Sequence, residues 1–363
     1  MKILHYINNL GSGGAEKLLT DILPLMKKEG YDVSLVISNS NRNMNRHEEV
    51  FKSNGIKIID LNTSFYNPLQ IISLIKLINR DKYDIVHGHL FPSQYWLAFA
   101  SFFLDKKIKL IKTEHSVHNE RKNYKLLRFI EKFIYNRYFK VIAITDQVND
   151  NLAEWLQNIV KIDVIHNGVN IQQVKEAQIL EPNLFSSHNV NLLMVGRFDG
   201  SQKDQATLIQ SLSLLPEKFH LFLAGEGPFI NESKKLVNQF GLKGRVHFLG
   251  MRQDVYSLMK QVDLNILSTN HEGLSGVALE SLASGKPFIG SDVVGVNNVV
   301  PNNKFLFQKG NPEFLASKIE EIISNKALQE LMVKQALEHV NNYDITIMAE
   351  KYLDLYKVNL TND

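Results

Sequence analysis

The sequence contains no cysteine among its 363 residues. Disulfide bonds and cysteine-ligated metal centres are therefore excluded, and so is a cysteine nucleophile. Long apolar runs are also missing, since the longest apolar stretch, residues 96–104, falls well short of the about 18 residues that cross a bilayer. The amino-terminal MKILHYINNL is too short and too polar for the core of a signal peptide. These absences predict a cytoplasmic protein without a membrane span.

A strong charge imbalance is absent as well, because 41 Lys and Arg residues face 38 Asp and Glu residues. Basic residues exceed acidic ones in residues 1–180, and the reverse holds in residues 181–363. No recognition helix, RNA-binding signature or aromatic stacking pattern accompanies the small basic excess, so nucleic acid is not an expected partner. The length and the 44% hydrophobic content fit a globular protein of two domains, which implies a cleft.

Short β-branched runs alternate with helix-length segments such as residues 14–29 and 68–80. The runs comprise residues 3–7, 33–38, 56–61, 84–89, 108–113, 141–145 and 161–166, and then residues 191–196, 219–225, 245–250, 264–268 and 286–291. Continuous apolar runs of this kind are typical of parallel strands covered on both faces. The rhythm restarts after a polar stretch near residues 170–190, which predicts two doubly wound α/β domains. Ligands of such sheets bind beyond the carboxyl ends of the strands.

The first strand-end loop, GSGGAEKLL at residues 11–19, opens a helix with glycines. Glycines let a backbone approach a ligand, and helix amides favour an anion. A nicotinamide dinucleotide fits poorly, because its fingerprint would need Gly or Ala where Glu16 stands and an acid near residues 38–40. A diphosphate or sugar near Gly13 and Gly14 is preferred, and a glycine turn that only packs strand against helix is the alternative.

A second loop, VGRFDGSQKDQATLI at residues 195–209, places two cations on one strand-loop-helix corner. Arg197 and Lys203 there suit a pyrophosphate, because each can neutralise charge that grows on a departing nucleotide. Surface lysines and arginines are more often simply solvated. The pair alone therefore leaves both interpretations open.

The third loop, STNHEGLSGVALESLASGKP at residues 268–287, is the most informative. Glu272 follows a strand, and Glu280 comes eight positions later on the next helix. Glutamates recur at this spacing by chance, but glycines between them open a helix amino terminus that suits phosphates and sugar hydroxyls. An ionised carboxylate accepts two hydroxyl hydrogen bonds, which a ribose diol offers. A solvent-facing Glu280 is disfavoured by the packed sequence ALESLA around it.

Histidines follow two strands of the first half. His115, in TEHS, lies in an expected ligand-facing loop, although a lone histidine there is usually structural. His87 and His89, in DIVHGHL, suggest metal ligands at first sight. We expect alternating strand residues to point to opposite faces and so not to chelate one ion, and we predict no metal.

Together these loops resemble the GT-B retaining glycosyltransferases of family 4 (glycosyl transferases group 1) over essentially the whole chain. The matching elements, in order, are GSGGAE, DIVHGH, TEH, VIHNGV, GRFDGSQK, AGEGP, VHFLG, EGLSGVALESLASGKP and SDVVG. The resemblance implies two Rossmann-like domains that face each other across a cleft, residues 1–168 on the acceptor side and residues 169–344 binding a nucleotide sugar. It also implies that residues 345–363 hold a helix returning to the first domain.

The resemblance further implies a role for each candidate residue. It places Arg197 and Lys203 on the donor diphosphate, Glu280 on the ribose, and Glu272 near the transferred sugar. The backbone after Glu272 binds the donor too, through Gly273, Leu274, Ser275 and Gly276. Gly13 and Gly14 close over the phosphates, and His115 lies near the sugar and the acceptor. The catalytic residues that the resemblance implies are then Glu272, His115, Arg197 and Lys203. Neither a metal nor another cofactor is required.

The segment of residues 120–140 suggests a basic amphipathic helix. Its basic stripe comprises Arg121, Lys125, Arg128 and Lys132, and its apolar face comprises Leu127, Ile130, Phe133 and Ile134. Such a helix can lie on an anionic membrane, or it can be an ordinary helix with its apolar face in the core and its charges in water. Its place directly after His115 favours a role in meeting a lipid-linked acceptor at the inner face of the cell membrane.

The sequence thus predicts transfer of a hexose or N-acetylhexosamine from a UDP-sugar, with a GDP-sugar less favoured. The expected acceptor is a glycan or polyprenyl-linked saccharide in the synthesis of a bacterial surface polysaccharide such as a capsule or exopolysaccharide. This setting rests on the resemblance alone. Two rivals stay open, a nucleotide-sugar epimerase or hydrolase on the same fold and a non-catalytic partner subunit that only binds sugar.

Overall fold

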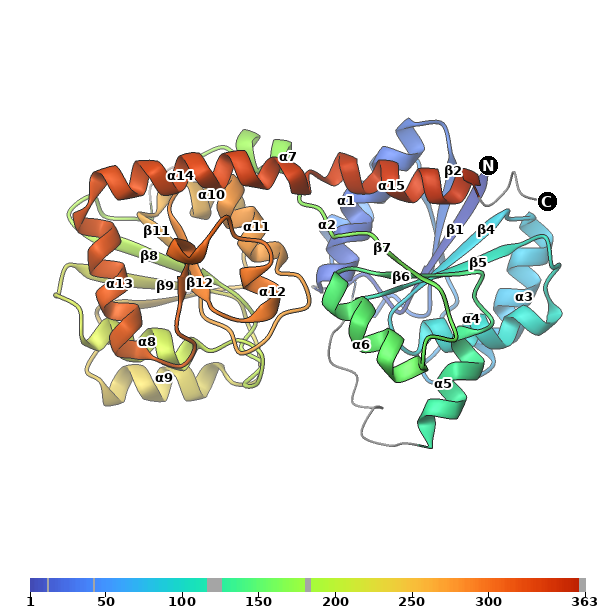
Figure 1. The fold of residues 1–363 in the computed structure, drawn as a ribbon, viewed down its shortest axis with the longest axis horizontal. Coiled ribbons are helices and arrows are strands. Elements are labelled where there is room, and N and C mark those ends of the chain that lie inside the picture. The colour runs from blue at the N-terminus through green and yellow to red at the C-terminus, as the bar shows by residue number, and fades with distance from the viewer. Residues whose placement is uncertain (12, 42, 116–125, 180–183, 359–363) are drawn as a thin grey trace. The chain divides into compact units, whose positions relative to one another are not determined.

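The computed structural model describes residues 1–363 except 12, 42, 116–125, 180–183 and 359–363. The chain forms two compact units (Figure 1). Unit 1 comprises Met1–Gly168 and Ile345–Asp363, and unit 2 comprises Val169–Asp344.

Unit 1 is built on a seven-stranded parallel sheet with the strand order β3-β2-β1-β4-β5-β6-β7. The strands are β1 (Lys2–Ile7), β2 (Asp32–Ile37), β3 (Lys57–Asp60), β4 (Ile85–His89), β5 (Lys109–Glu114), β6 (Lys140–Ala143) and β7 (Ile162–Val164). The order reverses direction next to β1, where β4 pairs with it on the side opposite β2. The loops after β1 and β4 therefore adjoin this switch point, where open α/β sheets bind ligands.

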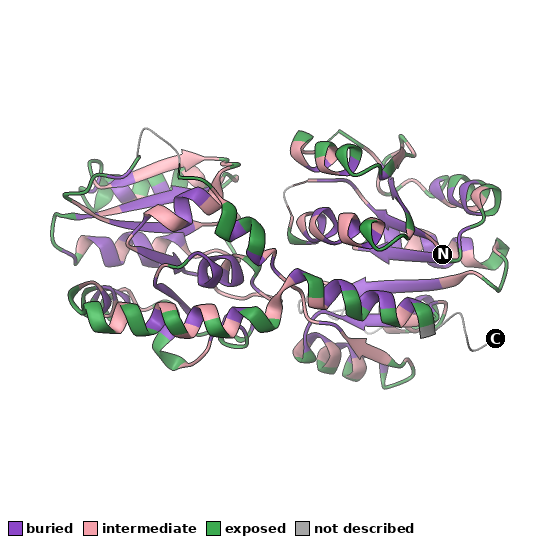
Figure 2. Ribbon diagram, turned by 90° about the horizontal axis from the view of Figure 1, so that it is seen from above, coloured by how far each residue is buried: buried purple, intermediate pink, exposed green. Residues whose placement is uncertain are grey.

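Helices cover both faces of the unit 1 sheet, and Figure 2 shows its strands largely buried. The helices are α1 (Gly14–Lys28), α2 (Asn45–Ser53), α3 (Gln70–Asp81), α4 (Ser93–Ala100), α5 (Leu127–Tyr135), α6 (Asp146–Leu156) and α15 (Ile345–Val358), with a 3-10 turn η1 (Ser101–Phe103). One core joins alternate strand residues to α1, α2 and α15. The residues between them form a second core with α3, α4, α5 and α6.

Helix α15 packs against α1 on one face of the unit 1 sheet. Its buried positions follow the three- and four-residue spacing of an amphipathic helix, namely Ile345, Met348, Ala349, Tyr352, Leu353 and Tyr356. Helix α15 therefore belongs to the unit that contains β1, although all of unit 2 lies between them in sequence.

Unit 2 contains a six-stranded parallel sheet with the order β10-β9-β8-β11-β12-β13. Its strands are β8 (Val190–Val195), β9 (Phe219–Ala224), β10 (Val246–Gly250), β11 (Leu264–Leu267), β12 (Phe288–Ser291) and β13 (Leu306–Phe307). Its helices are α7 (Ile171–Glu176), α8 (Gln205–Ser213), α9 (Ile230–Gln239), α10 (Val255–Gln261), α11 (Gly276–Ala283), α12 (Val294–Asn297), α13 (Pro312–Ser324) and α14 (Lys326–Val340), with 3-10 turns η3 (Asn303–Phe305) and η4 (Asn341–Tyr343). The predicted class, two doubly wound α/β domains, is confirmed.

Helix α5 differs from the amphipathic helix expected at residues 120–140. Arg121 and Lys125 lie outside the described residues, so the full basic stripe is not placed. Arg128 stacks 4.8 Å from the Trp155 ring centroid, and Lys132 hydrogen-bonds Gln157.

The outward side of α5 is apolar instead. Leu126, Phe129, Ile130 and Phe133 are exposed by 77%, 71%, 47% and 46%, and we call these four residues the α5 apolar face. Of the apolar face expected for this helix, Ile134 is buried and Leu127 half-buried, whereas Ile130 and Phe133 are exposed, so the interpretation of an ordinary helix holds for only part of that face. The helix is held inward by Glu131, Ile134 and Tyr135, which are fully buried. None of the helices within the described residues has the length and apolar character of a membrane span.

Candidate active site

The loop after β8 is shaped by the side chain of Asp199. Its Oδ1 accepts hydrogen bonds from the backbone N–H groups of Ser201, Gln202 and Lys203, at 3.0, 2.7 and 3.2 Å. An aspartate whose side chain accepts from backbone N–H groups a few residues later in the sequence stabilises a tight loop. This fixes the backbone of Lys203 at the carboxyl end of the sheet, immediately before α8.

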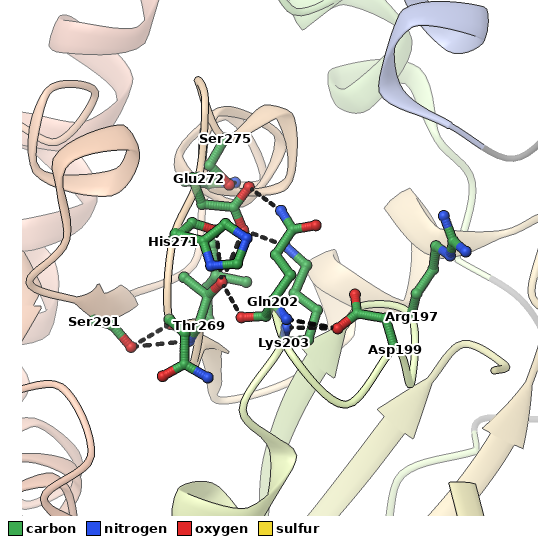
Figure 3. Close-up of polar contacts among 12 residues, drawn as sticks. Arg197, Asp199, Gln202, Lys203, Thr269, His271, Glu272, Ser275 and Ser291 are labelled. Carbon is green, nitrogen blue, oxygen red and sulfur yellow. Dashed lines mark hydrogen bonds and ion pairs between the residues drawn. The ribbon is translucent and has the colours of Figure 1, made fainter. Parts of the chain in front are cut away.

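Lys203 and Glu272 meet in the structure, as Figure 3 shows. The ammonium of Lys203 pairs with Oε1 of Glu272, and their side chains are only 10% and 7% exposed. The Gln202 amide donates to the second carboxylate oxygen at 3.0 Å, and the Thr269 hydroxyl donates to the first at 3.1 Å. The loops after β8 and β11 are thus joined by one nearly buried carboxylate with three donors.

Arg197 does not join this cluster. It is exposed at the end of β8, and Figure 3 shows its side chain pointing away from Glu272. Its backbone is held by a hydrogen bond of 2.9 Å from the Gln205 side-chain amide to its carbonyl oxygen. The backbone of Arg197 is therefore fixed while its guanidinium lies in solvent, where it can bind a negatively charged group of a ligand.

Glycines behind the site make close backbone packing possible. A Cβ on Gly225 would clash with the carbonyl oxygen of Gly196, and a Cβ on Gly227 would clash with that of Phe198. Gly225 also has φ +147°, a conformation that other residues rarely adopt. On the other side, a Cβ on Gly295 would clash with the backbone of Glu272. The glycines of the AGEGP and SDVVG motifs therefore allow these segments to pack directly against the backbone of the GRFDGSQK and HEG loops.

The segment after Glu272 begins helix α11. Ser275 is buried and caps the helix, since its Oγ accepts from the backbone N–H of Ala278 at 3.3 Å. Its own N–H donates to the Gly295 carbonyl at 3.1 Å. Gly273 and Leu274 are half-buried and Gly276 is exposed at the helix start. The side chain of Ser275 is used to cap the helix, and binding of the nucleotide sugar by the backbone here stays a prediction.

Glu280 lies one helical segment further on and is 9% exposed. Its Oε1 accepts a hydrogen bond of 3.0 Å from the hydroxyl of Tyr256 on α10. This confirms the packed surroundings that ALESLA indicates. Tyr256 was missed in the sequence, because its partner Glu280 lies on a different helix and no local spacing connects the two. Gln202, Thr269 and Asp199 were missed as well.

The glycine loop of unit 1 contains an acid of its own. Gly13 is the N-cap of α1, and a Cβ there would clash with the carboxylate of Glu16. Glu16 is 9% exposed, and its carboxylate lies beside the N-cap residue of α1. A negative charge at this end of a helix is favoured by the helix dipole. Gly14 has open space around its Cβ position.

His115 follows β5 in unit 1 and is joined to other histidines. Its Nε2 lies 3.2 Å from Nδ1 of His89, and Nε2 of His89 lies 3.0 Å from Nδ1 of His5. His87 and His89 stack with ring centroids 4.3 Å apart. The expectation that these two point to opposite faces is therefore wrong. Strand residues two positions apart lie on the same face, and only immediate neighbours alternate.

The same cluster is the group of described residues that could hold a metal, since ligand atoms of His5, His87 and His89 lie within 4.8 Å of one another. Hydrogen bonds already use both nitrogens of His87, which lie 2.6 Å from the Tyr356 hydroxyl and 2.8 Å from Thr113 Oγ1. Burial lowers the pKa of all three rings, so they are neutral near pH 7. The expectation of no metal stays a prediction.

Comparison with known families decides the class. Residues 12–173 match the family described as "Glycosyltransferase Family 4", and residues 189–325 match "Glycosyl transferases group 1". The chain belongs to the glycosyltransferases. The two matches fall on unit 1 and unit 2 respectively, apart from a short overrun past Gly168. The Lys203–Glu272 pair and Glu280 lie within the group 1 match.

Relatives of this glycosyltransferase include an Escherichia coli protein named UDP-Gal:alpha-D-GlcNAc-diphosphoundecaprenol alpha-1,3-galactosyltransferase. It is 24% identical, over 94% of this chain and 93% of its own length. A Campylobacter jejuni protein named as a 4-alpha-N-acetylgalactosaminyltransferase acting on a diphospho-undecaprenol-linked saccharide is 24% identical, over 89% of this chain and 92% of its own. This glycosyltransferase therefore resembles enzymes named for lipid-linked saccharides along most of its length.

Solved structures share the fold. Anabaena HepE, determined in complex with UDP and glucose, superimposes with a TM-score of 0.84 at 20% identity, covering 99% of this chain and 100% of the other. WaaG, a glycosyltransferase of lipopolysaccharide biosynthesis, gives a TM-score of 0.73 at 17% identity, covering 98% and 99%. This glycosyltransferase thus has the GT-B fold.

Proposed function

We propose that this glycosyltransferase uses a UDP-sugar and transfers a hexose or N-acetylhexosamine with retention at the anomeric carbon. The observation that carries the proposal is the Lys203–Glu272 pair, nearly buried at the carboxyl ends of two strands of unit 2. A lysine held there can meet the donor diphosphate, and exposed Arg197 adds a second cation from the same loop after β8. Glu280, held by Tyr256, binds the ribose diol.

In the proposed reaction the bond from the anomeric carbon to the UDP oxygen breaks, and a bond to the acceptor oxygen forms on the same face. The acceptor hydroxyl proton passes to an oxygen of the leaving diphosphate. Lys203 and Arg197 stabilise the charge that develops on that diphosphate, so a protein nucleophile is not needed. His115 is assigned a role at the sugar or acceptor, and no metal takes part.

The donor is tested with a panel of UDP- and GDP-sugars. We expect thermal stabilisation by at least one UDP-sugar, since a ligand that binds the folded state raises its stability. Release of UDP should be slow alone and accelerate with a polyprenyl-diphosphate-linked saccharide, also when EDTA is present. The Glu280→Ala variant should lose the stabilisation, and Glu320→Ala, at an exposed position of α13, should keep it. If none of these nucleotide sugars stabilised the protein or released its nucleotide, the donor proposal would be disproved. Fast release of UDP without acceptor would favour a hydrolase.

The acceptor is proposed to be a lipid-linked saccharide at the cytoplasmic face of the cell membrane, in surface polysaccharide synthesis. Two of the relatives are named for undecaprenol-linked substrates, which supports this class. The α5 apolar face supports it independently, because four large apolar side chains on one short helix are costly in water and suit a membrane surface. Phe102 extends this face, stacked 5.7 Å from Phe133 between ring centroids.

Replacing Phe129 and Phe133 together with serine should weaken binding to vesicles by at least about tenfold. Transferring one exposed aromatic side chain into an apolar environment is worth about 1.5–3 kcal/mol, and about 1.4 kcal/mol is a tenfold change. The measurement is co-sedimentation with vesicles of phosphatidylglycerol and phosphatidylethanolamine. Phe314→Ser, at a similarly exposed site in unit 2, is the control. Equal sedimentation of the double variant and the parent would show that α5 does not make the contact.

A further inference from the structure

Three histidines of unit 1 form a continuous chain of hydrogen bonds. It starts at His5 in β1, passes through His89 at the end of β4, and ends at His115 after β5. The joining distances are 3.0 Å from His5 Nδ1 to His89 Nε2 and 3.2 Å from His89 Nδ1 to His115 Nε2. The chain therefore runs across neighbouring strands from the buried sheet to a strand-end loop.

All three rings are neutral at physiological pH. Burial lowers the pKa of His5 to about 3 and that of His115 to about 4, and it lowers the pKa of His89 well below its usual range. A neutral imidazole carries one N–H and one lone pair. In a chain of such rings every N–H must point in the same direction, so the tautomer at one end fixes the tautomer at the other.

The buried end selects the direction. Nε2 of His5 is buried and has no hydrogen-bond partner among the described residues. If the N–H groups pointed toward His5, this nitrogen would carry a proton with no acceptor, and orphaned buried N–H groups are the rarer kind. If they point toward His115, only a lone pair is left there. In this arrangement His89 Nδ1–H donates to His115 Nε2, and His115 carries its proton on Nδ1.

His87 holds the middle of the chain in place. Its ring stacks on His89 at 4.3 Å and on His5 at 5.2 Å between centroids. Its nitrogens are fixed by the hydroxyls of Tyr356 and Thr113, and Thr113 Oγ1 lies 3.1 Å from the Tyr352 hydroxyl. Helix α15 thus supports the ring against which His89 lies. Fixed ring planes keep the nitrogens of the chain in register.

We propose that His5 and His89 are positioning residues that hold His115 in the Nδ1–H tautomer. His115 then offers a hydrogen-bond donor to a sugar hydroxyl or phosphate oxygen, and it cannot act as the base toward the acceptor hydroxyl through that nitrogen. The role rests on the proposed function of His115 in sugar transfer. It deepens that function, because the acceptor proton must then go to another group.

The tautomer can be measured without any substrate. Two-bond ¹H–¹⁵N correlation spectra of protein labelled at histidine distinguish a protonated from a bare ring nitrogen, and a His115→Gln sample identifies the His115 signals. We expect Nδ1 of His115 to be protonated and Nε2 to be bare. In His89→Phe the partner is lost, and His115 should move toward the Nε2–H form that free histidine favours. His5→Phe should produce a mixture of the two His115 tautomers, because His89 can then carry its proton on either ring nitrogen.

Matched variants separate this role from general packing. His47→Gln replaces another buried histidine of unit 1 outside the chain and should leave the His115 signals unchanged. In transfer assays His89→Phe should lower kcat by about 10- to 100-fold, the range found when a partner that orients a metal-bound histidine is lost, with little change in the donor KM. His89→Gln carries an amide N–H that can donate to His115 and should recover part of the rate.

An Nε2–H form of His115 in the parent protein would overturn the proposal, and so would unchanged His115 signals in both phenylalanine variants. Far-ultraviolet circular dichroism checks that each variant is folded, and His5→Phe serves if His89→Phe is not. Failure of the proposed function would appear differently: His115 would have the expected tautomer, but the protein would transfer no sugar from any nucleotide sugar.

Discussion

Replacing Glu272 with glutamine is expected to slow sugar transfer by about 10²- to 10³-fold, the range found when one preorganised electrostatic contact is lost at a reaction centre. Glutamine keeps the size of the side chain but removes the charge that organises Lys203, Gln202 and Thr269. Lys203 is then left without its partner at a site that is 10% exposed. The measurement is the rate of transfer from the UDP-sugar identified by the panel, with exposed Glu320→Gln as the control.

A double-mutant cycle decides whether this pair acts on the ligand or only holds the fold. Breaking a buried ion pair from one side costs about 3–5 kcal/mol, whereas removing both charges costs much less. The Lys203→Met/Glu272→Gln double variant should therefore recover thermal stability relative to either single variant. Its transfer rate should stay low, because the diphosphate has lost a cation. Recovery of rate along with stability would mean that the pair is structural.

Unit 1 should lose stability steeply as the pH falls below about 6.5, because its buried histidines have lowered pKa values in the folded state. The unfolded chain then binds more protons than the folded one, so this stability is complete above the unfolded pKa of 6.5 and declines toward the folded values of about 3 for His5 and about 4 for His115. Between about pH 7.5 and about pH 5 each such histidine lowers the free energy of unfolding by about 2 kcal/mol. The loss from three such histidines approaches the whole free energy of unfolding of a domain.

The chain carries its own reporter for this experiment. Both of its 2 tryptophans, Trp96 and Trp155, belong to unit 1, so urea unfolding followed by tryptophan fluorescence observes that unit selectively. The midpoint should fall clearly between pH 7.5 and 5, and His5→Phe should reduce the dependence by one histidine's share. His188→Gln, at an exposed site in unit 2, is the control. A midpoint that does not change over this range would show that the histidines titrate normally in the folded protein.

The fold was predictable because its signal is local and repeated. Continuous β-branched runs predict all strands except β13, whose two residues, Leu306 and Phe307, are too few to form a pattern. The loops that contain Lys203, Glu272 and Glu280 follow from strand ends in the same way. Their meeting does not, because the contact of Lys203 with Glu272 joins positions 69 apart in sequence. Tyr256 was missed for the same reason.

Two other expectations depended on which way side chains point. The error over His87 and His89 came from the geometry of the strand and could have been avoided, since residues at this spacing share a face. The outward face of α5 could not be predicted from spacing alone. A helix with apolar and basic sides can turn either side inward, and here Trp155 and Gln157 contact the basic side chains while buried Glu131 bonds Tyr95 and Trp155. Partners from other elements decide such a choice.

The return of α15 to unit 1 has a consequence for synthesis. The strands that contain His5 and His87 leave the ribosome early, but Tyr352 and Tyr356, which lie against this histidine stack, follow only after all of unit 2. Until then one face of the first sheet lacks its final covering helix, whereas unit 2 is continuous in sequence and can complete its core. The unit that is translated first is therefore the last to be finished, and a truncated chain exposes imidazoles and apolar side chains together.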